Sequence, residues 1–256
     1  MKKSVKDSIS GPSAMLSSMR VLDRGTIAVL LTIPLFLWAI QFFGLTVNFF
    51  QFFPSVTRRF SPDVANLLSF VYWSVCCAVG YVGLPLLVIS RVLKDKARNF
   101  GLPGKPSLSH GWIYCTLYLA VLPFVVFAAF QKSFLSVYPF YLPSAGKWQL
   151  FLIFEAFYLL QFFSLEFFFR GYILFSLERT FGVYSIFIMT IPYCMIHFPK
   201  PALEALAAIL AGIVLGWLAL RTRSIWYGVM IHMSVALTMD VLALVRGGYL
   251  PRLFLH

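Results

Sequence analysis

Charged side chains are scarce in this sequence, at 12% of its 256 residues, whereas hydrophobic residues make up 60%. The mean hydropathy is +0.84. This composition excludes a soluble domain of this length, because apolar runs so long and so numerous are typical of a polytopic helical membrane protein. We therefore predict an all-α transmembrane bundle with about seven spans, within a range of roughly six to eight.

Acidic residues are also few, with 9 against 21 basic residues and a net charge of +12. The basic residues lie in short connections between apolar runs, where they act as topology signals and contact anionic lipid headgroups. This placement argues against a nucleic-acid partner and favours membrane lipids. Residues 1–24 are predicted to form a basic tail on the membrane surface, and 25–256 a single transmembrane domain.

Several common signatures are missing. The 4 cysteines all fall in apolar runs and none has metal-ligand spacing, so we interpret them as small hydrophobic residues. No small-residue cleavage site follows the first apolar run, which is therefore interpreted as a retained helix rather than a signal peptide. The chain has no internal repeat, no low-complexity tract and no His-Glu-x-x-His zincin signature.

The apolar runs predict the order of the spans. Counting about 20 apolar residues for each crossing places them near 27–47, 64–92, 112–130, 148–179, 181–198, 202–220 and 225–245. The turn between the fourth and fifth runs is expected near 180–182. Basic residues in the tail, in the 91–105 loop and near the ends of later runs favour a cytoplasmic N-terminus.

Three ionisable residues interrupt these apolar runs: Glu166, His197 and His232. Such residues at membrane depth are costly and mark functional sites by default. Glu166 precedes the predicted turn by about 14 residues and His197 follows it by about 15, which places both on the order of 21–23 Å from the turn. His232 lies nearer to the start of its own span. We expect the three to form a polar site inside the bilayer.

Helical spacing adds further candidates. Arg170 follows Glu166 by one turn, where it can form an ion pair that orients the carboxylate. Glu155 precedes Glu166 by about three turns on nearly the same face. Tyr193 lies one turn before His197. Asp240 follows His232 by about two turns on the same face of its helix. Ordinary interpretations exist for each residue alone, such as a structural ion pair, an interfacial cap or a helix–helix hydrogen bond. Their combination at comparable depth favours a functional site.

The chemistry of this set suits peptide hydrolysis. A carboxylate in a low-dielectric pocket is a stronger base, so Glu166 would deprotonate water while a histidine protonates the leaving amine or stabilises the oxyanion. The alternative is a divalent metal such as zinc, held by Glu166, His197 and His232 with an open position for water. The sequence leaves open whether there is a metal or no cofactor at all.

Three segments in order resemble a known family. Residues 165–171, LEFFFRG, resemble the Glu-Glu-x-x-x-Arg-Gly motif of the CAAX prenyl protease type II and bacteriocin-processing (CPBP, Abi) family, and Tyr193 to His197 resembles its Phe-x-x-x-His motif. Residues 212–226, continuing to His232, resemble its third block. Two positions depart from the pattern, since Leu165 replaces the first glutamate and Ala236 stands where an Asn or Asp is common.

The resemblance implies an intramembrane endopeptidase of a prokaryotic cytoplasmic membrane, with its catalytic core at about 150–245. Its glutamate and histidines would activate water, and its substrates would be peptides or proteins with a membrane-proximal or lipidated segment. The departures keep a second hypothesis open, a catalytically degenerate membrane scaffold or immunity protein of the same fold. A transporter would be expected to have broken helices or repeated halves, and neither is evident.

Overall fold

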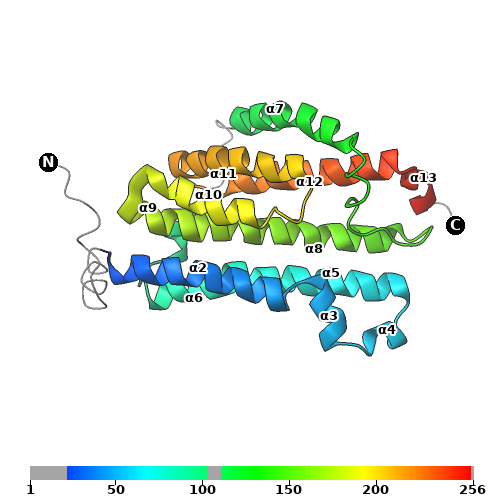
Figure 1. The fold of residues 1–256 in the computed structure, drawn as a ribbon, viewed down its shortest axis with the longest axis horizontal. Helices are drawn as coiled ribbons and strands as arrows, with labels where there is room; N and C mark the ends of the chain where they lie inside the picture. The colour runs from blue at the N-terminus through cyan, green and yellow to red at the C-terminus, as the bar shows by residue number, and fades with distance from the viewer. Residues whose placement is uncertain (1–21, 103–110, 255–256) are drawn as a thin grey trace.

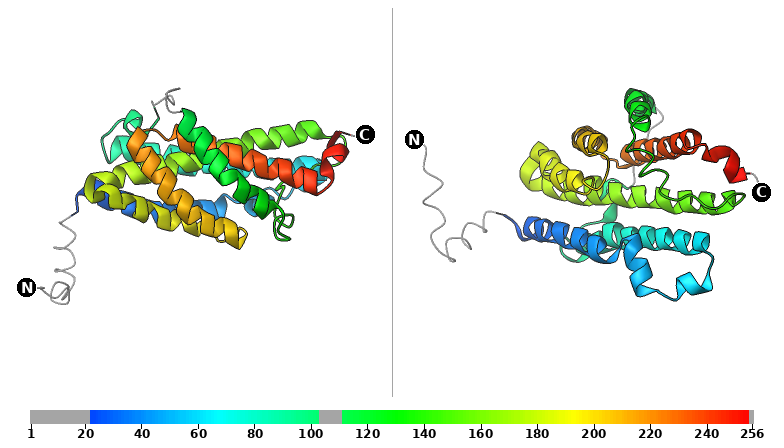
Figure 2. Two further views of the ribbon diagram at one scale, coloured as in Figure 1. Left: turned by 90° about the horizontal axis from the view of Figure 1, so that it is seen from above. Right: turned by 45° about the vertical axis from the view of Figure 1, so that its right-hand side comes forward.

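The computed structural model describes residues 22–102 and 111–254, and within this part of the chain it contains helices and no strand. In the view of Figure 1 the long helices run alongside one another, and the two further views show them in layers, with the helices at Gly111–Ala129 and Ala202–Thr222 crossing the others obliquely (Figure 2). The predicted all-α bundle is confirmed. Most of the predicted basic tail, residues 1–21, lies outside the described residues.

The α-helices vary from short surface turns to full membrane-spanning lengths. In chain order they are α2 (Arg24–Phe43), α3 (Thr46–Phe52), α4 (Val56–Arg59), α5 (Pro62–Ala78), α6 (Leu84–Arg91), α7 (Gly111–Ala129), α8 (Trp148–Glu166), α9 (Phe175–Phe181), α10 (Ser185–Met195), α11 (Ala202–Thr222), α12 (Trp226–Arg246) and α13 (Tyr249–Phe254). Shorter helical turns occupy Ala97–Phe100 and Gly182–Tyr184, and π-helical turns occupy Val79–Gly83 and Phe167–Leu174.

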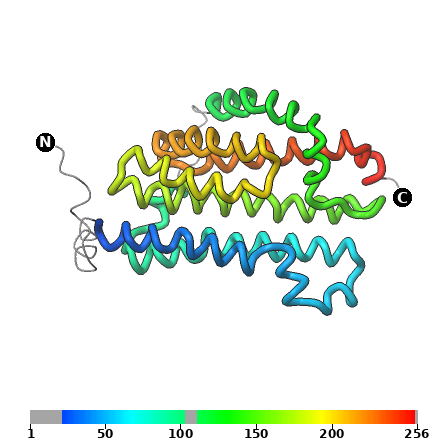
Figure 3. The backbone as a smooth tube through the Cα atoms, viewed as in Figure 1, coloured from blue at the N-terminus to red at the C-terminus, as the bar shows by residue number. Residues whose placement is uncertain are grey.

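Among the described residues, 6 helical stretches are long and apolar enough to cross a membrane. The longest, Trp148–Met195, has 48 residues and doubles back on itself, so that α8 and α10 form two arms joined by α9 (Figure 3). The predicted fourth and fifth runs are these two arms. The number of spans therefore agrees with the predicted range.

Gly182 makes the turn between the two arms. Its φ of 55° and ψ of −136° are adopted readily by glycine and rarely by other residues. Its backbone N–H donates to the carbonyl of Glu178 and so ends α9. The predicted position of the turn, 180–182, is confirmed.

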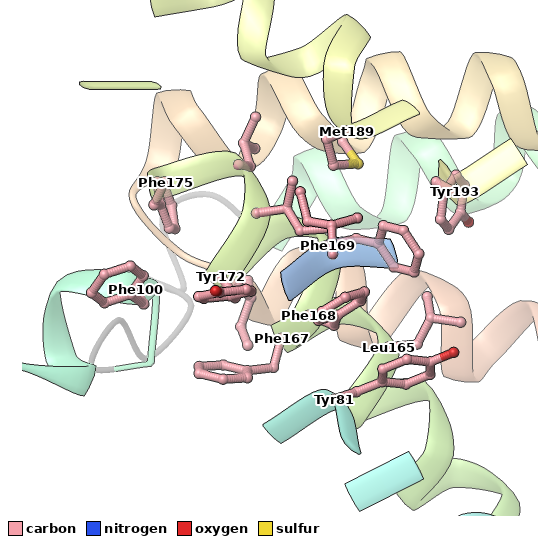
Figure 4. Packing of buried hydrophobic residues seen from close by; sticks show 14 of the residues in the cluster. Tyr81, Phe100, Leu165, Phe167, Phe168, Phe169, Tyr172, Phe175, Met189 and Tyr193 are labelled. Atoms are coloured by element: carbon pink, nitrogen blue, oxygen red, sulfur yellow. The ribbon is translucent and has the colours of Figure 1, made fainter. Parts of the chain in front are cut away.

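A π-helical segment directly follows Glu166. Phe167, Phe168 and Phe169 are fully buried there, and Tyr81 from the other π-helical segment stacks on Phe168 with ring centroids 4.8 Å apart (Figure 4). These three phenylalanines therefore pack inside the bundle and do not face lipid. Their close van der Waals packing holds the neighbouring Glu166 in place, and π-turns of this kind are frequent at functional sites.

Candidate functional site

Glu166 and His232 meet in the middle of the bundle. Nδ1 of His232 on α12 lies 2.6 Å from Oε1 of Glu166 at the end of α8, and the glutamate is fully buried. The distance matches a charge-assisted hydrogen bond, in which the imidazole N–H donates to the carboxylate. The structure thus brings His232 to the depth of Glu166, although its place along the seventh run predicted a shallower position.

Arg170 completes the charge balance of this centre. Its Nη1 donates to the same Oε1 atom at 3.0 Å, and neither side chain has any exposed surface. A buried carboxylate is strongly destabilising unless it is paired and hydrogen-bonded. The predicted one-turn pair therefore exists, and it supplies the positive charge that a buried ionised Glu166 needs.

Tyr193 contacts three of the other candidate residues: His232, Arg170 and His197. Its hydroxyl lies 2.9 Å from Nε2 of His232, and its ring lies under the guanidinium of Arg170, with Cζ 4.0 Å from the ring centroid. In the tautomer whose Nδ1 donates to Glu166, Nε2 is the acceptor and the tyrosine hydroxyl is the donor. A phenylalanine at this position would keep the ring contacts and lose the hydroxyl.

His197 lies on the other side of Tyr193. Its ring centroid is 4.8 Å from that of Tyr193, and its Nδ1 donates to the Tyr193 backbone carbonyl at 2.8 Å. No hydrogen bond joins His197 to Glu166 within the described residues. Since Nδ1 carries the proton, Nε2 of the neutral ring presents a lone pair. The hairpin thus brings His197 close to this centre, with Tyr193 between it and His232.

Glu155 and Asp240 lie in a different place. Their carboxyl groups are neighbours that hydrogen-bond to each other, both are buried, and neither has another hydrogen-bond partner among the described residues. Glu155 is about three turns of α8 away from Glu166. These two supporting candidates therefore form a second polar pair. At the two departures from the family motif, Leu165 and Ala236 are buried in hydrophobic clusters.

The second oxygen of Glu166 has a distinctive environment. Oε2 is buried and has no hydrogen-bond partner among the described residues, whereas Oε1 accepts two hydrogen bonds. Gly228 on α12 lies directly against it, because a Cβ atom there would collide with Oε2. The sequence analysis did not identify Gly228, since a lone glycine in an apolar helix indicates no particular partner.

The donor set does not form a metal site in this arrangement. Among the described residues, no group of three or more His, Cys, Asp or Glu side chains is placed to hold a metal ion. Both ring nitrogens of His232 and one oxygen of Glu166 already form hydrogen bonds with protein groups. The geometry of these side chains therefore does not fit the zinc alternative.

These features define a polytopic helical protein with a buried carboxylate–imidazole–guanidinium centre. Comparison with family models identifies residues 147–238 as matching the family described as Type II CAAX prenyl endopeptidase Rce1-like. The matched segment contains all the residues of the centre, and the resemblance predicted from the motifs is confirmed. No curated protein and no solved structure gives a match. The family indicates a protease acting on a peptide or protein, and the apolar helices indicate an integral membrane protein.

Proposed function

We propose that this protein is an intramembrane endopeptidase in which Glu166 activates water. The proposal is supported above all by the asymmetry of the Glu166 carboxylate, whose Oε1 is held by Arg170 and His232, while Oε2 is buried and finds no hydrogen-bond partner in the part of the chain that the structure describes. A buried polar atom without a partner calls for an explanation, and a catalytic role is one of the few available. Oε2 is the atom that would take a proton from water.

The reaction follows from this assignment. Glu166 Oε2 removes one proton from a water molecule, and the resulting hydroxide attacks the carbonyl carbon of the scissile peptide. The C–N bond then breaks, and the proton passes to the leaving amine. General base catalysis of this kind contributes on the order of 10²–10⁴-fold.

The neighbouring residues position the base. His232 donates from Nδ1 to Oε1, and the Tyr193 hydroxyl holds the other ring nitrogen, so the imidazole cannot rotate away. Arg170 favours the ionised form of the carboxylate through its ion pair. With Oε1 occupied by two donors, the free lone pairs of Oε2 are the ones directed at the substrate.

His197 would act from the far side of Tyr193. Its unprotonated Nε2 accepts a hydrogen bond from water or takes up a proton for transfer to the leaving amine. The substrate would be a peptide with a membrane-proximal or lipidated segment, because the centre lies between membrane-spanning helices. Glu155 and Asp240 have no direct role in this proposal.

We also propose that the end of the bundle at which α2 begins faces the cytoplasm. Arg91, Arg98, Arg179 and Arg223 lie in or next to the connections at that end. Basic residues in short connections are retained on the cytoplasmic side.

Replacing the base tests the proposal. Membranes containing Glu166→Gln should cleave co-expressed reporters at least about 100-fold more slowly than wild type, because an amide cannot accept the proton. The reporters would carry a prenylated C-terminus, a leader peptide or a transmembrane tail. Glu178→Gln is the matched control, since Glu178 pairs with Arg223 at the hairpin turn, away from the centre. Undiminished cleavage by Glu166→Gln would remove Glu166 from the mechanism.

A further inference from the structure

A second polar feature lies at the end of the bundle, away from Glu166. A cavity of about 180 Å³ is bordered there by Asp23 and Thr26 at the start of α2 and by Ser176 and Arg179 on α9. Val29, Val92 and Leu93 form its apolar side. The cavity therefore combines an acid, a base and a hydroxyl with a hydrocarbon wall.

Ser176 contributes an unpaired polar group beside the cavity. The residue is only 5% exposed, and its hydroxyl has no hydrogen-bond partner among the described residues. A serine in a helix usually donates to a carbonyl one turn earlier, and a buried hydroxyl without any partner is unfavourable. A polar group in the cavity would satisfy it.

The two charged residues of the cavity are held in position by protein partners; Asp23 contributes its negative charge, and Arg179 retains hydrogen-bonding capacity. Asp23 accepts from the Thr26 backbone at 3.0 Å and from the Thr180 hydroxyl at 3.3 Å, and the hydrogen bonds from Thr26 lower its pKa, so it stays ionised. One nitrogen of Arg179 pairs with Asp95. A guanidinium has five N–H donors, so others remain available to an anionic oxygen.

Location and size restrict the ligand. The stretches Arg24–Phe43 and Pro62–Arg91 both have an end at this cavity, and the hairpin turn lies beside it, so the cavity is at the level of the lipid headgroups. Its volume is below the roughly 300–1,000 Å³ of sites that enclose drug-sized ligands, and several times the approximately 30 Å³ that one water molecule occupies. A headgroup fits these limits better than a peptide.

We propose that this cavity binds the headgroup of a zwitterionic aminophospholipid. The phosphate would accept hydrogen bonds from Arg179 and Ser176, and the ammonium would donate to Asp23. The apolar side formed by Val29, Val92 and Leu93 would contact the start of the acyl chains. Opposite charges on opposite parts of one small ligand match the acid and the base that border the site. The inference is independent of the proposed catalysis.

Thermal unfolding of the purified full chain in detergent tests the proposal. Phosphatidylethanolamine should raise Tm by about 2–4 °C. Phosphatidylcholine, which has no N–H to donate, and phosphatidylglycerol, which has no ammonium, should raise it by less. Ser176→Leu should abolish the difference by filling the cavity while leaving the Arg179–Asp95 pair intact. Arg179→Gln should also reduce it.

Arg223→Gln is the matched control, because it removes another exposed, acid-paired arginine at the same end and should keep the full shift. Equal shifts with all three lipids, or a full shift in Ser176→Leu, would overturn the proposal. Inorganic phosphate and soluble phosphoethanolamine distinguish the source of the ligand. If either alone gives the same shift as the lipid, and Ser176→Leu removes that shift, the site binds a free solute and the lipid assignment is wrong.

Discussion

Gly228 on α12 lies so close to Glu166 on α8 that a Cβ atom at this position would collide with Oε2 of the carboxylate. The missing side chain thus leaves room for the oxygen that we propose as the base. Helix interfaces in membranes commonly use small residues for close approach. Here the small residue faces a carboxylate oxygen rather than another backbone.

Gly228→Ala should therefore inactivate the protein. We expect cleavage to fall about 100-fold, because a displacement of the base by about 1 Å has effects of that size. Gly83→Ala is the matched control, since its new Cβ would meet only the Ala78 carbonyl at 3.9 Å. Cleavage and Tm would be measured for both variants, and wild-type cleavage by Gly228→Ala would show that Oε2 does not act where we place it.

The hydroxyl of Tyr193 provides a second test. Tyr193→Phe removes the hydrogen bond to Nε2 of His232 and keeps the ring beneath Arg170. Loss of one hydrogen bond of about 1 kcal/mol should lower kcat roughly five- to tenfold and leave KM nearly unchanged. Tyr118→Phe loses a comparable bond of 2.7 Å to Thr238 at a distance from the centre. Equal kcat values in the two variants would contradict a positioning role for Tyr193.

Metal removal should leave activity intact. The described residues contain no group of three metal-ligating side chains, and His232 already uses both ring nitrogens. We expect purified protein treated with EDTA or 1,10-phenanthroline to cleave at the wild-type rate. Loss of cleavage that added zinc restores, together with a stoichiometric metal content, would establish the zinc alternative and require a rearranged centre.

The Glu155–Asp240 pair should matter for stability rather than for catalysis. Asp240→Asn introduces an amide that can donate to the neighbouring Glu155 carboxylate and removes one of two adjacent acidic groups that repel each other when both are ionised. We expect the free energy of unfolding to rise by about 1 kcal/mol, with cleavage unchanged. A loss of cleavage as large as that of Glu166→Gln would instead assign this pair a part in the reaction.

Much of the architecture could be predicted from local pattern. Apolar runs long enough to cross a membrane predicted the helical stretches, and the turn at Gly182 divides the longest one near the expected position. The Glu166–Arg170 pair was equally accessible, because helical geometry alone brings residues one turn apart together. These features depend on neighbours in the sequence.

Contacts between helices could not be predicted in the same way. The hydrogen bond from His232 to Glu166, the position of Tyr193 between two histidines and the approach of Gly228 depend on the rotation and tilt of α10 and α12. The same geometry brings Asp240 of α12 beside Glu155 of α8, about three helical turns from Glu166, so these two residues form a pair of their own. The sequence by itself predicted a membrane bundle with Glu166, Arg170 and His197 at comparable depth, and it placed His232 nearer to the start of its own span. Only tertiary packing decided which oxygen of Glu166 remains free, because helix rotation is set by side-chain contacts along entire interfaces and not by the spacing of any single motif.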